Sequence, residues 1–133
     1  MLVRVETLRQ EPSGPVVVRV HSAVGAAVVV WEDGAREAVG GEHHIEWTVD
    51  EDIAWAGNTR SAASATSGVR EEGDHIVFRG RLGLTEDGAA VLDVGGALIL
   101  FEIAGPPPPD DADGTWVEVR AGRSSVSVWP CRY

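Results

Sequence analysis

The sequence predicts a single all-β domain over residues 1–133, with seven to nine short antiparallel strands forming a curved barrel of the oligonucleotide/oligosaccharide-binding (OB) type or a sandwich. Apolar and polar residues alternate with a period of two in several segments, the spacing of a half-buried strand. Turn signals recur about every eight to twelve residues. No segment shows the spacing of an amphipathic helix. A chain of 133 residues can bury a core without disulfides or metals.

The segment 75–103 is the centre of the predicted sheet. Its first half alternates, so Arg79 and Arg81 lie on the face opposite the apolar residues. Asp87-Gly88 predicts a turn, because glycine takes positive φ without a steric penalty. The apolar residues of this half share one face: Ile76, Phe78, Leu82 and Leu84.

A Gly95-Gly96 pair interrupts the second half of that segment. It predicts either a tight turn or a bulge that bends one long strand. The run 97–103 that follows is apolar at both odd and even positions. This pattern predicts a strand buried on both of its faces.

The N-terminal half reads as a series of short strands separated by glycine-containing turns. The clearest alternation spans residues 42–49, where Ile45 and Trp47 face one way and His44 and Glu46 the other. An acid-acid-glycine turn is expected at 32–34. The strands expected in this half span residues 2–8, 16–21, 26–31, 35–39 and 42–49.

Two segments are expected to be surface loops. Residues 57–68 are small and polar, with a short helix across 61–67 as a weaker alternative. Residues 105–114 combine prolines with acids that repel one another, which favours extended chain. The last strands are expected over residues 115–121 and 124–129, with Pro130 ending the second.

The composition restricts the class of partner. The chain carries 21 acidic and 11 basic residues, a formal net charge of −10, and its basic residues are all arginine. Nucleic-acid and anionic membrane binding both rest on an excess of basic residues, so we expect neither. An acidic surface instead favours a basic protein partner.

The one cysteine, Cys131, allows no internal disulfide, which fits a cytoplasmic protein. The N-terminal residues form no apolar stretch of the secretory type, and no apolar run approaches the ~20 residues of a membrane-spanning helix.

The leading functional hypothesis is a non-enzymatic, acidic protein-binding module, of the type of a bacterial immunity or inhibitor protein. Residues 32–56 contain eight acids and one arginine, and tryptophans lie within and beside this segment. Tryptophan supplies binding energy at interfaces, while acidic groups steer a basic partner. The residues predicted to bind the partner are Glu42, Glu46, Trp47, Asp50, Glu51, Asp52 and Trp55.

The alternative is a small-ligand or oligosaccharide-binding β-barrel that uses Trp55 and Trp116 as stacking surfaces. Trp116 lies on the polar face of its expected strand, which predicts that it is either half exposed or caps one end of a barrel. Trp31 and Trp129 end apolar runs, which predicts that both lie in the core.

No metal, cofactor or catalytic residue is expected. His43 and His44 are adjacent on a strand and point to opposite faces, so a zinc site would need His75 or His21 as well. No nucleophile elbow or phosphate-binding loop is present in the sequence. We therefore expect no enzymatic activity.

The location of Trp47 and Trp55 distinguishes the hypotheses. Exposure on a flat acidic face favours a protein interface. A concave position favours a ligand site. Full burial leaves a structural role alone.

Overall fold

A computed structural model describes residues 1–10, 15–32 and 41–131, and confirms the all-β class. These described residues form eleven strands in one continuous sheet, more than the seven to nine expected. The expected strand at 35–39, and most of the turn at 32–34, lie outside the described residues. Within the described part of the chain, no helix has the length and apolar character needed to cross a bilayer.

Nine of the described strands follow predicted segments, whereas the fifth and sixth, at residues 59–61 and 68–72, were not predicted. Two short 3-10 helices, η2 (Asp110–Ala112) and η3 (Arg123–Ser125), flank the tenth strand. The strands are β1 (Leu2–Gln10), β2 (Val16–Ser22), β3 (Gly25–Trp31), β4 (Gly41–Val49), β5 (Thr59–Ser61), β6 (Gly68–Glu72), β7 (His75–Leu84), β8 (Ala89–Val94), β9 (Ala97–Glu102), β10 (Trp116–Gly122) and β11 (Val126–Pro130).

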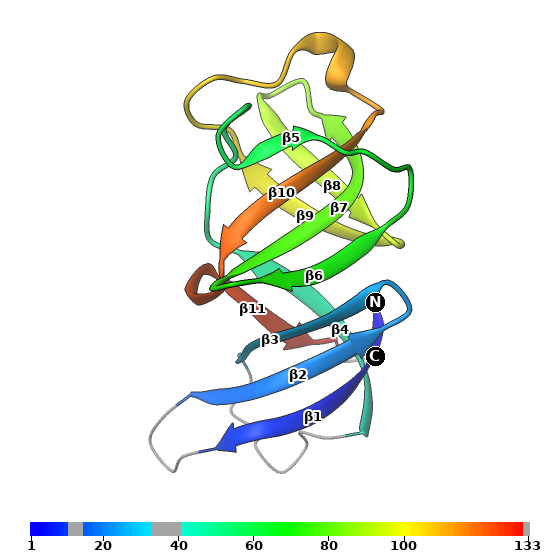
Figure 1. Ribbon diagram of the computed structural model, residues 1–133, viewed down its shortest axis with the longest axis vertical. Helices are drawn as coiled ribbons and strands as arrows, with labels where there is room; N and C mark the ends of the chain where they lie inside the picture. The colour runs from blue at the N-terminus through cyan, green and yellow to red at the C-terminus, as the bar shows by residue number, and fades with distance from the viewer. Residues whose placement is uncertain (11–14, 33–40, 132–133) are drawn as a thin grey trace.

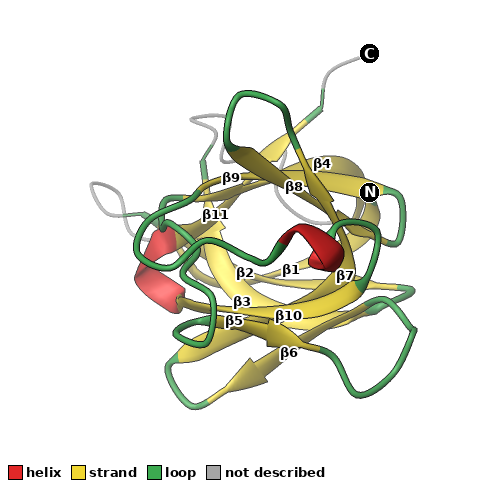
Figure 2. Cartoon of the chain, turned by 90° about the horizontal axis from the view of Figure 1, so that it is seen from above, coloured by secondary structure: helices red, strands yellow, loops and turns green. Residues whose placement is uncertain are grey.

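Five of these strands close into a ring, which is the barrel alternative rather than the sandwich. β1 pairs antiparallel with β2 and β4, β2 pairs with β3, and β4 pairs with β11. The spatial order β4-β1-β2-β3 is a Greek key. A parallel pairing of β11 with β3 then closes the ring. The ring fills the lower half of Figure 1, and Figure 2 shows its strands curving around a common interior.

The remaining strands form a second curved sheet above the ring (Figure 1). β7 is its centre: β10 pairs along one edge, while β6 and then β8 pair along the other. β5 extends the sheet beyond β10, and β9 extends it beyond β8. A bridge between Ile53 and Ile103 links the two ends of this sheet. All these strands are inserted in the sequence between β4 and β11 of the ring.

The ring and the upper sheet share one apolar core. Trp47 of the ring packs edge-on against Phe78 of the upper sheet, with ring centroids 5.3 Å apart. A parallel bridge between Gly25 and Val69 joins β3 to β6. A Cβ atom on Gly25 would lie 1.9 Å from the Val69 carbonyl oxygen, and the residue has a φ of +140°. This junction therefore requires glycine.

Two predictions of burial were wrong. The run 97–103 was expected to be buried on both faces, yet Leu98 and Leu100 are 68% and 69% exposed. In the described part of the chain β9 pairs with β8 alone, and its outer face is not covered. Trp129 was expected in the core and is 47% exposed, because Val126 and Val128 take the inward positions of β11.

The two predicted loops were correct in part. Residues 57–68 contain the strand β5, which was missed, and 61–67 form no helix. The 105–114 segment is mostly exposed, but it contains η2 and buries Pro108. Gly95 and Gly96, both at positive φ, form a two-residue hairpin turn between β8 and β9 rather than a bulge.

Candidate functional site

Trp47 lies in the core and is not available to a partner. Its side chain is 7% exposed, because it takes one of the inward positions of β4 together with Ile45 and Val49. Its indole Nε1–H donates to the Met1 sulfur at 3.4 Å. Burial of Trp47 is the outcome that leaves this residue a structural role.

The acidic residues predicted to surround Trp47 are spread along β4 rather than gathered. Glu42 and Glu46 are exposed on the outer face of the strand. Asp50 and Asp52 are exposed beyond its end, and Asp50 is already about 27 Å along the chain from Glu42 at strand spacing. The Glu51 carboxylate accepts a hydrogen bond from the Gly122 N–H at 2.9 Å, so it stabilises the start of η3.

Trp55 and Trp116, by contrast, line one hollow. Its volume is about 560 Å³. Both indoles are half-buried, which for Trp116 is one of the two expected outcomes. One wall is the segment 61–65, and the other is formed by residues of the 109–115 segment, including Pro109 and Asp111. These two residues, predicted as stacking surfaces for a ligand, meet at one hollow although they lie far apart in the sequence.

A network of local hydrogen bonds fixes the backbone that carries Trp55. The Asn58 side chain accepts from the Ala54 N–H and donates to the Asp52 carbonyl, each at 2.8 Å. Between them Ala56 takes a positive φ of 62°, which is strained for a residue other than glycine. The Trp55 N–H donates to the Pro106 carbonyl at 2.8 Å, which ties this turn to the opposite wall.

Hydrogen bonds also hold the backbone of both walls of the hollow, residues 61–65 and 109–115. The Ala62 N–H donates to the Trp116 carbonyl at 2.9 Å, which attaches the 61–65 segment to β10. The Thr115 hydroxyl donates to the Ala112 carbonyl at 2.6 Å and closes the turn after η2. The hollow therefore has two aromatic surfaces, small side chains between them, and exposed oxygen groups on Ser61, Ser64 and Asp111. Such a site can pack the flat apolar side of a ligand and bond its hydroxyl groups.

A second cluster, which sequence reasoning missed, surrounds Glu118 on β10. Its side chain is 11% exposed and pairs with Arg70 at 3.0 Å, Arg60 at 3.3 Å and Arg79 at 3.4 Å. The hydrogen bond from Arg70 is the main cause that lowers the pKa of the Glu118 carboxyl, and burial opposes it. The same bond raises the pKa of Arg70.

Together with Arg81 of β7 and Arg120 of β10, these arginines lie on one outer face that spans four strands. Strand register places Arg79 and Arg60 on either side of Glu118, and Trp116 directly opposite Arg81. Arg70 and Arg120 flank Val77 in the next row. We call the arginine face the set Arg60, Arg70, Arg79, Arg81 and Arg120. The alternation of Arg79 with Arg81 was visible in the sequence, but the register that joins the strands was not.

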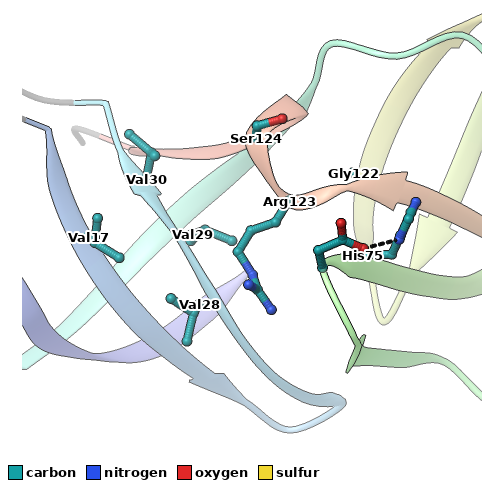
Figure 3. Close-up of a pocket in the computed structure, with 9 residues that line it drawn as sticks. Val17, Val28, Val29, Val30, His75, Gly122, Arg123 and Ser124 are labelled. Carbon is teal, nitrogen blue, oxygen red and sulfur yellow. Dashed lines mark ion pairs between the residues drawn. The ribbon is translucent and has the colours of Figure 1, made fainter.

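A second hollow, of about 550 Å³, lies at the seam between the ring and the upper sheet (Figure 3). Valines of β2 and β3 face it from one side, and His75 and Arg123 from the other. His75 lies 2.8 Å from the Asp74 carboxylate, and Arg123 donates to the Gly73 carbonyl at 2.9 Å. Both contacts are to residues of the turn between β6 and β7.

The histidines do not gather. His43 packs edge-on against Trp31, with centroids 5.1 Å apart, and His21 lies 3.5 Å from the Glu6 carboxylate. Across residues 1–10, 15–32 and 41–131, no three side chains of metal-ligating type come together.

Comparison of the chain with protein-family models, with curated proteins and with solved structures finds no match in any of the three. The functional argument therefore depends on the geometry of these sites.

Proposed function

We propose that this protein is a non-enzymatic binding protein that holds an oligosaccharide in the hollow between Trp55 and Trp116. The observation that supports this is the meeting of two half-buried indoles, distant in the sequence, on the walls of one cavity. A volume of about 560 Å³ falls within the range of about 300–1,000 Å³ typical of small-ligand sites.

The chemistry of the lining suits a sugar. The apolar side of a sugar ring packs on an indole, which offers a large rigid surface. Alanines and a proline complete the lining with small side chains, and the Ser61 and Ser64 hydroxyls and the Asp111 carboxylate can bond the hydroxyl groups of the sugar. The fixed backbone on both walls reduces the entropy lost on binding.

The test is binding of a glycan array, followed by calorimetry on the saccharides that bind. Trp55→Ala and Trp116→Ala should each weaken binding about ten-fold or more, since each removes one stacking surface. Trp129→Ala is the matched control, because Trp129 is 47% exposed on β11 and lies outside the hollow. Equal affinity in all three variants, or silence of the whole array, would refute the proposal.

A protein partner remains the second candidate, on a different face from the one predicted. Leu98 and Leu100 are exposed and line a hollow with Glu46 of β4. Trp129 lies directly opposite Glu46 across the β4–β11 pair. Leu2, which is 51% exposed, lies opposite His44 across the β1–β4 pair. Exposed apolar groups around a carboxylate are typical of an interface for a basic partner.

Affinity capture from the source cell tests this second candidate. Trp129→Ala and Glu46→Arg should each weaken a captured partner at low salt, because they remove the anchor and reverse the charge. Charge reversal at Asp50 and Asp52 tests the site originally predicted. If none of these substitutions alters the affinity of a captured partner, that partner binds at another surface.

A further inference from the structure

The arginine face has an excess of positive charge in an acidic chain. Its arginines surround two carboxylates, Glu118 and Glu72, which pair with them at 3.0–3.6 Å. Asp93 lies opposite Arg81 on β8, so five positive and three negative groups leave a formal +2 on this face, while the whole chain carries −10. Neutralising one buried carboxylate needs one arginine, so Glu118 alone does not account for the arrangement.

The guanidinium groups are oriented but not used up. Each carries five N–H donors. Arg60 makes one contact with Glu118 at 3.3 Å and is 72% exposed, and Arg120 is 50% exposed beside Glu72 at 3.6 Å. Arg81 is exposed and donates to the Gly114 carbonyl at 3.2 Å. Several guanidinium groups on this face therefore keep N–H donors that can bond a ligand. Their positions are already fixed by the contacts with Glu118, Glu72 and the Gly114 carbonyl.

This face borders the proposed ligand hollow. Trp116 and Glu118 lie on the same face of β10, two residues and so about 7 Å apart. Arg81 is the cross-strand neighbour of Trp116, and Arg60 precedes Ser61 of the hollow wall. A ligand stacked on Trp116 can thus present its next residue to oriented guanidinium groups.

We infer that the ligand is an acidic oligosaccharide. One of its sugar rings lies on Trp116, and a carboxylate or sulfate on that sugar or on the adjacent sugar bonds Arg60 and Arg81. The inference rests on the proposed function and adds the class of sugar. Arginine bonds such oxyanions in a bidentate manner, which gives orientation as well as affinity. The negative charge of the rest of the chain opposes long polyanions, so a short oligomer is the expected ligand.

Calorimetry at low salt with three probes tests the inference: tetragalacturonate, chondroitin sulfate tetrasaccharide and neutral maltotetraose. The better of the two acidic probes should bind about ten-fold or more tightly than the neutral one, and its advantage should shrink as salt is added. The double change Arg60→Gln with Arg81→Gln should remove that advantage and leave the neutral probe unaffected. Arg60→Gln alone, at a largely exposed side chain, gives a second test that does not depend on Arg81.

Arg19→Gln is the matched control. Arg19 is 40% exposed on β2, pairs with a carboxylate at 3.7 Å and lies outside the arginine face. It should leave every affinity unchanged.

The outcomes separate the inference from the proposed function. If neutral and acidic probes bind alike, and Trp116→Ala weakens both, the hollow is the site and the arginine inference is wrong. If Trp116→Ala changes no affinity, or no probe binds, the proposed function fails and the inference fails with it. If a tetrameric oligothymidylate displaces the acidic saccharide at equal or lower concentration, the face recognises nucleic acid and the assignment to acidic sugars is overturned.

Discussion

Replacement of Glu118 by glutamine tests whether this carboxylate holds the arginine face together. The substitution keeps the shape of the side chain but removes the charge that pairs with Arg60, Arg70 and Arg79. The guanidinium groups would then face an amide whose N–H₂ end cannot accept their hydrogen bonds. We expect the variant to fold and to be less stable than the parent.

The magnitude follows from the distances and the exposure. The Arg70 contact at 3.0 Å is the shortest and contributes about 1–2 kcal/mol as a charged hydrogen bond. The contacts to Arg60 and Arg79, at 3.3 and 3.4 Å, involve side chains 72% and 26% exposed and add about 0.5 kcal/mol each. Glu118→Gln should therefore lower the free energy of unfolding by about 2 kcal/mol, or the melting temperature by about 8 °C.

Urea denaturation followed by circular dichroism measures this difference. Glu72→Gln is the matched control: Glu72 pairs with Arg70 at 3.3 Å but is 44% exposed, so its loss should cost about 0.5 kcal/mol. The pH dependence gives a further check. Because pairing lowers the pKa of Glu118, its contribution is complete above the ordinary glutamate value of about 4.3 and is lost as the pH falls through the lower pKa of the folded state.

The parent and Glu118→Gln should therefore converge in stability on acidification. Two results would refute the reasoning. One is a loss equal to that of Glu72→Gln, which would mean that the cluster has no special role. The other is a stability gap that persists undiminished at strongly acidic pH, where the parent carboxyl is protonated as well.

Three further predictions concern the fold. Gly80→Ala should lower the free energy of unfolding by at least about 3 kcal/mol, because the added Cβ would lie 2.3 Å from the Asp93 carbonyl oxygen. Gly83→Ala on the same strand should lower it by no more than about 1 kcal/mol, because the nearest atom to its Cβ is 3.7 Å away. Equal midpoints of urea denaturation for the two variants would contradict this prediction. Gly25→Ala should separate β3 from β6 and increase amide hydrogen exchange at Val69, and unchanged protection there would argue against the junction. In thermal denaturation, Trp47→Ala should lower the free energy of unfolding by about 3–5 kcal/mol and Trp129→Ala by less than about 1 kcal/mol. The reverse order would contradict the burial of these two side chains.

The alternation rule predicted most of the fold and accounts for its own failures. It grouped Trp47 with Ile45 on one face of β4, and the structure buries that face, although Trp47 was assigned to a partner-binding surface. On β11 strict alternation turns Trp129 outward, as observed, and the prediction that it lies in the core came from the apolar residues before it. Leu98 and Leu100 could not be assigned from the sequence, because whether a sheet covers the outer face of β9 depends on strand order.

The candidate sites were predictable to different degrees. Trp55 and Trp116 were named from residue type and strand face, but their meeting depends on the turn at Asn58 and on the bond from Trp55 to Pro106. The cluster at Glu118 was not found, because its arginines come from four separate segments that only pairing register aligns. β5 was missed for a related reason: three residues carry too little pattern, and pairing with β10 makes them a strand.

The indole N–H resonances of the five tryptophans offer the most direct measurement of the central claim. They can be assigned by single Trp→Phe changes and followed while the best-binding saccharide is added. The account predicts that the Trp55 and Trp116 signals shift together along one binding curve, while those of the buried Trp31 and Trp47 and of the exposed Trp129 stay in place. A saturable shift at Trp129 with no movement at Trp55 and Trp116 would contradict it.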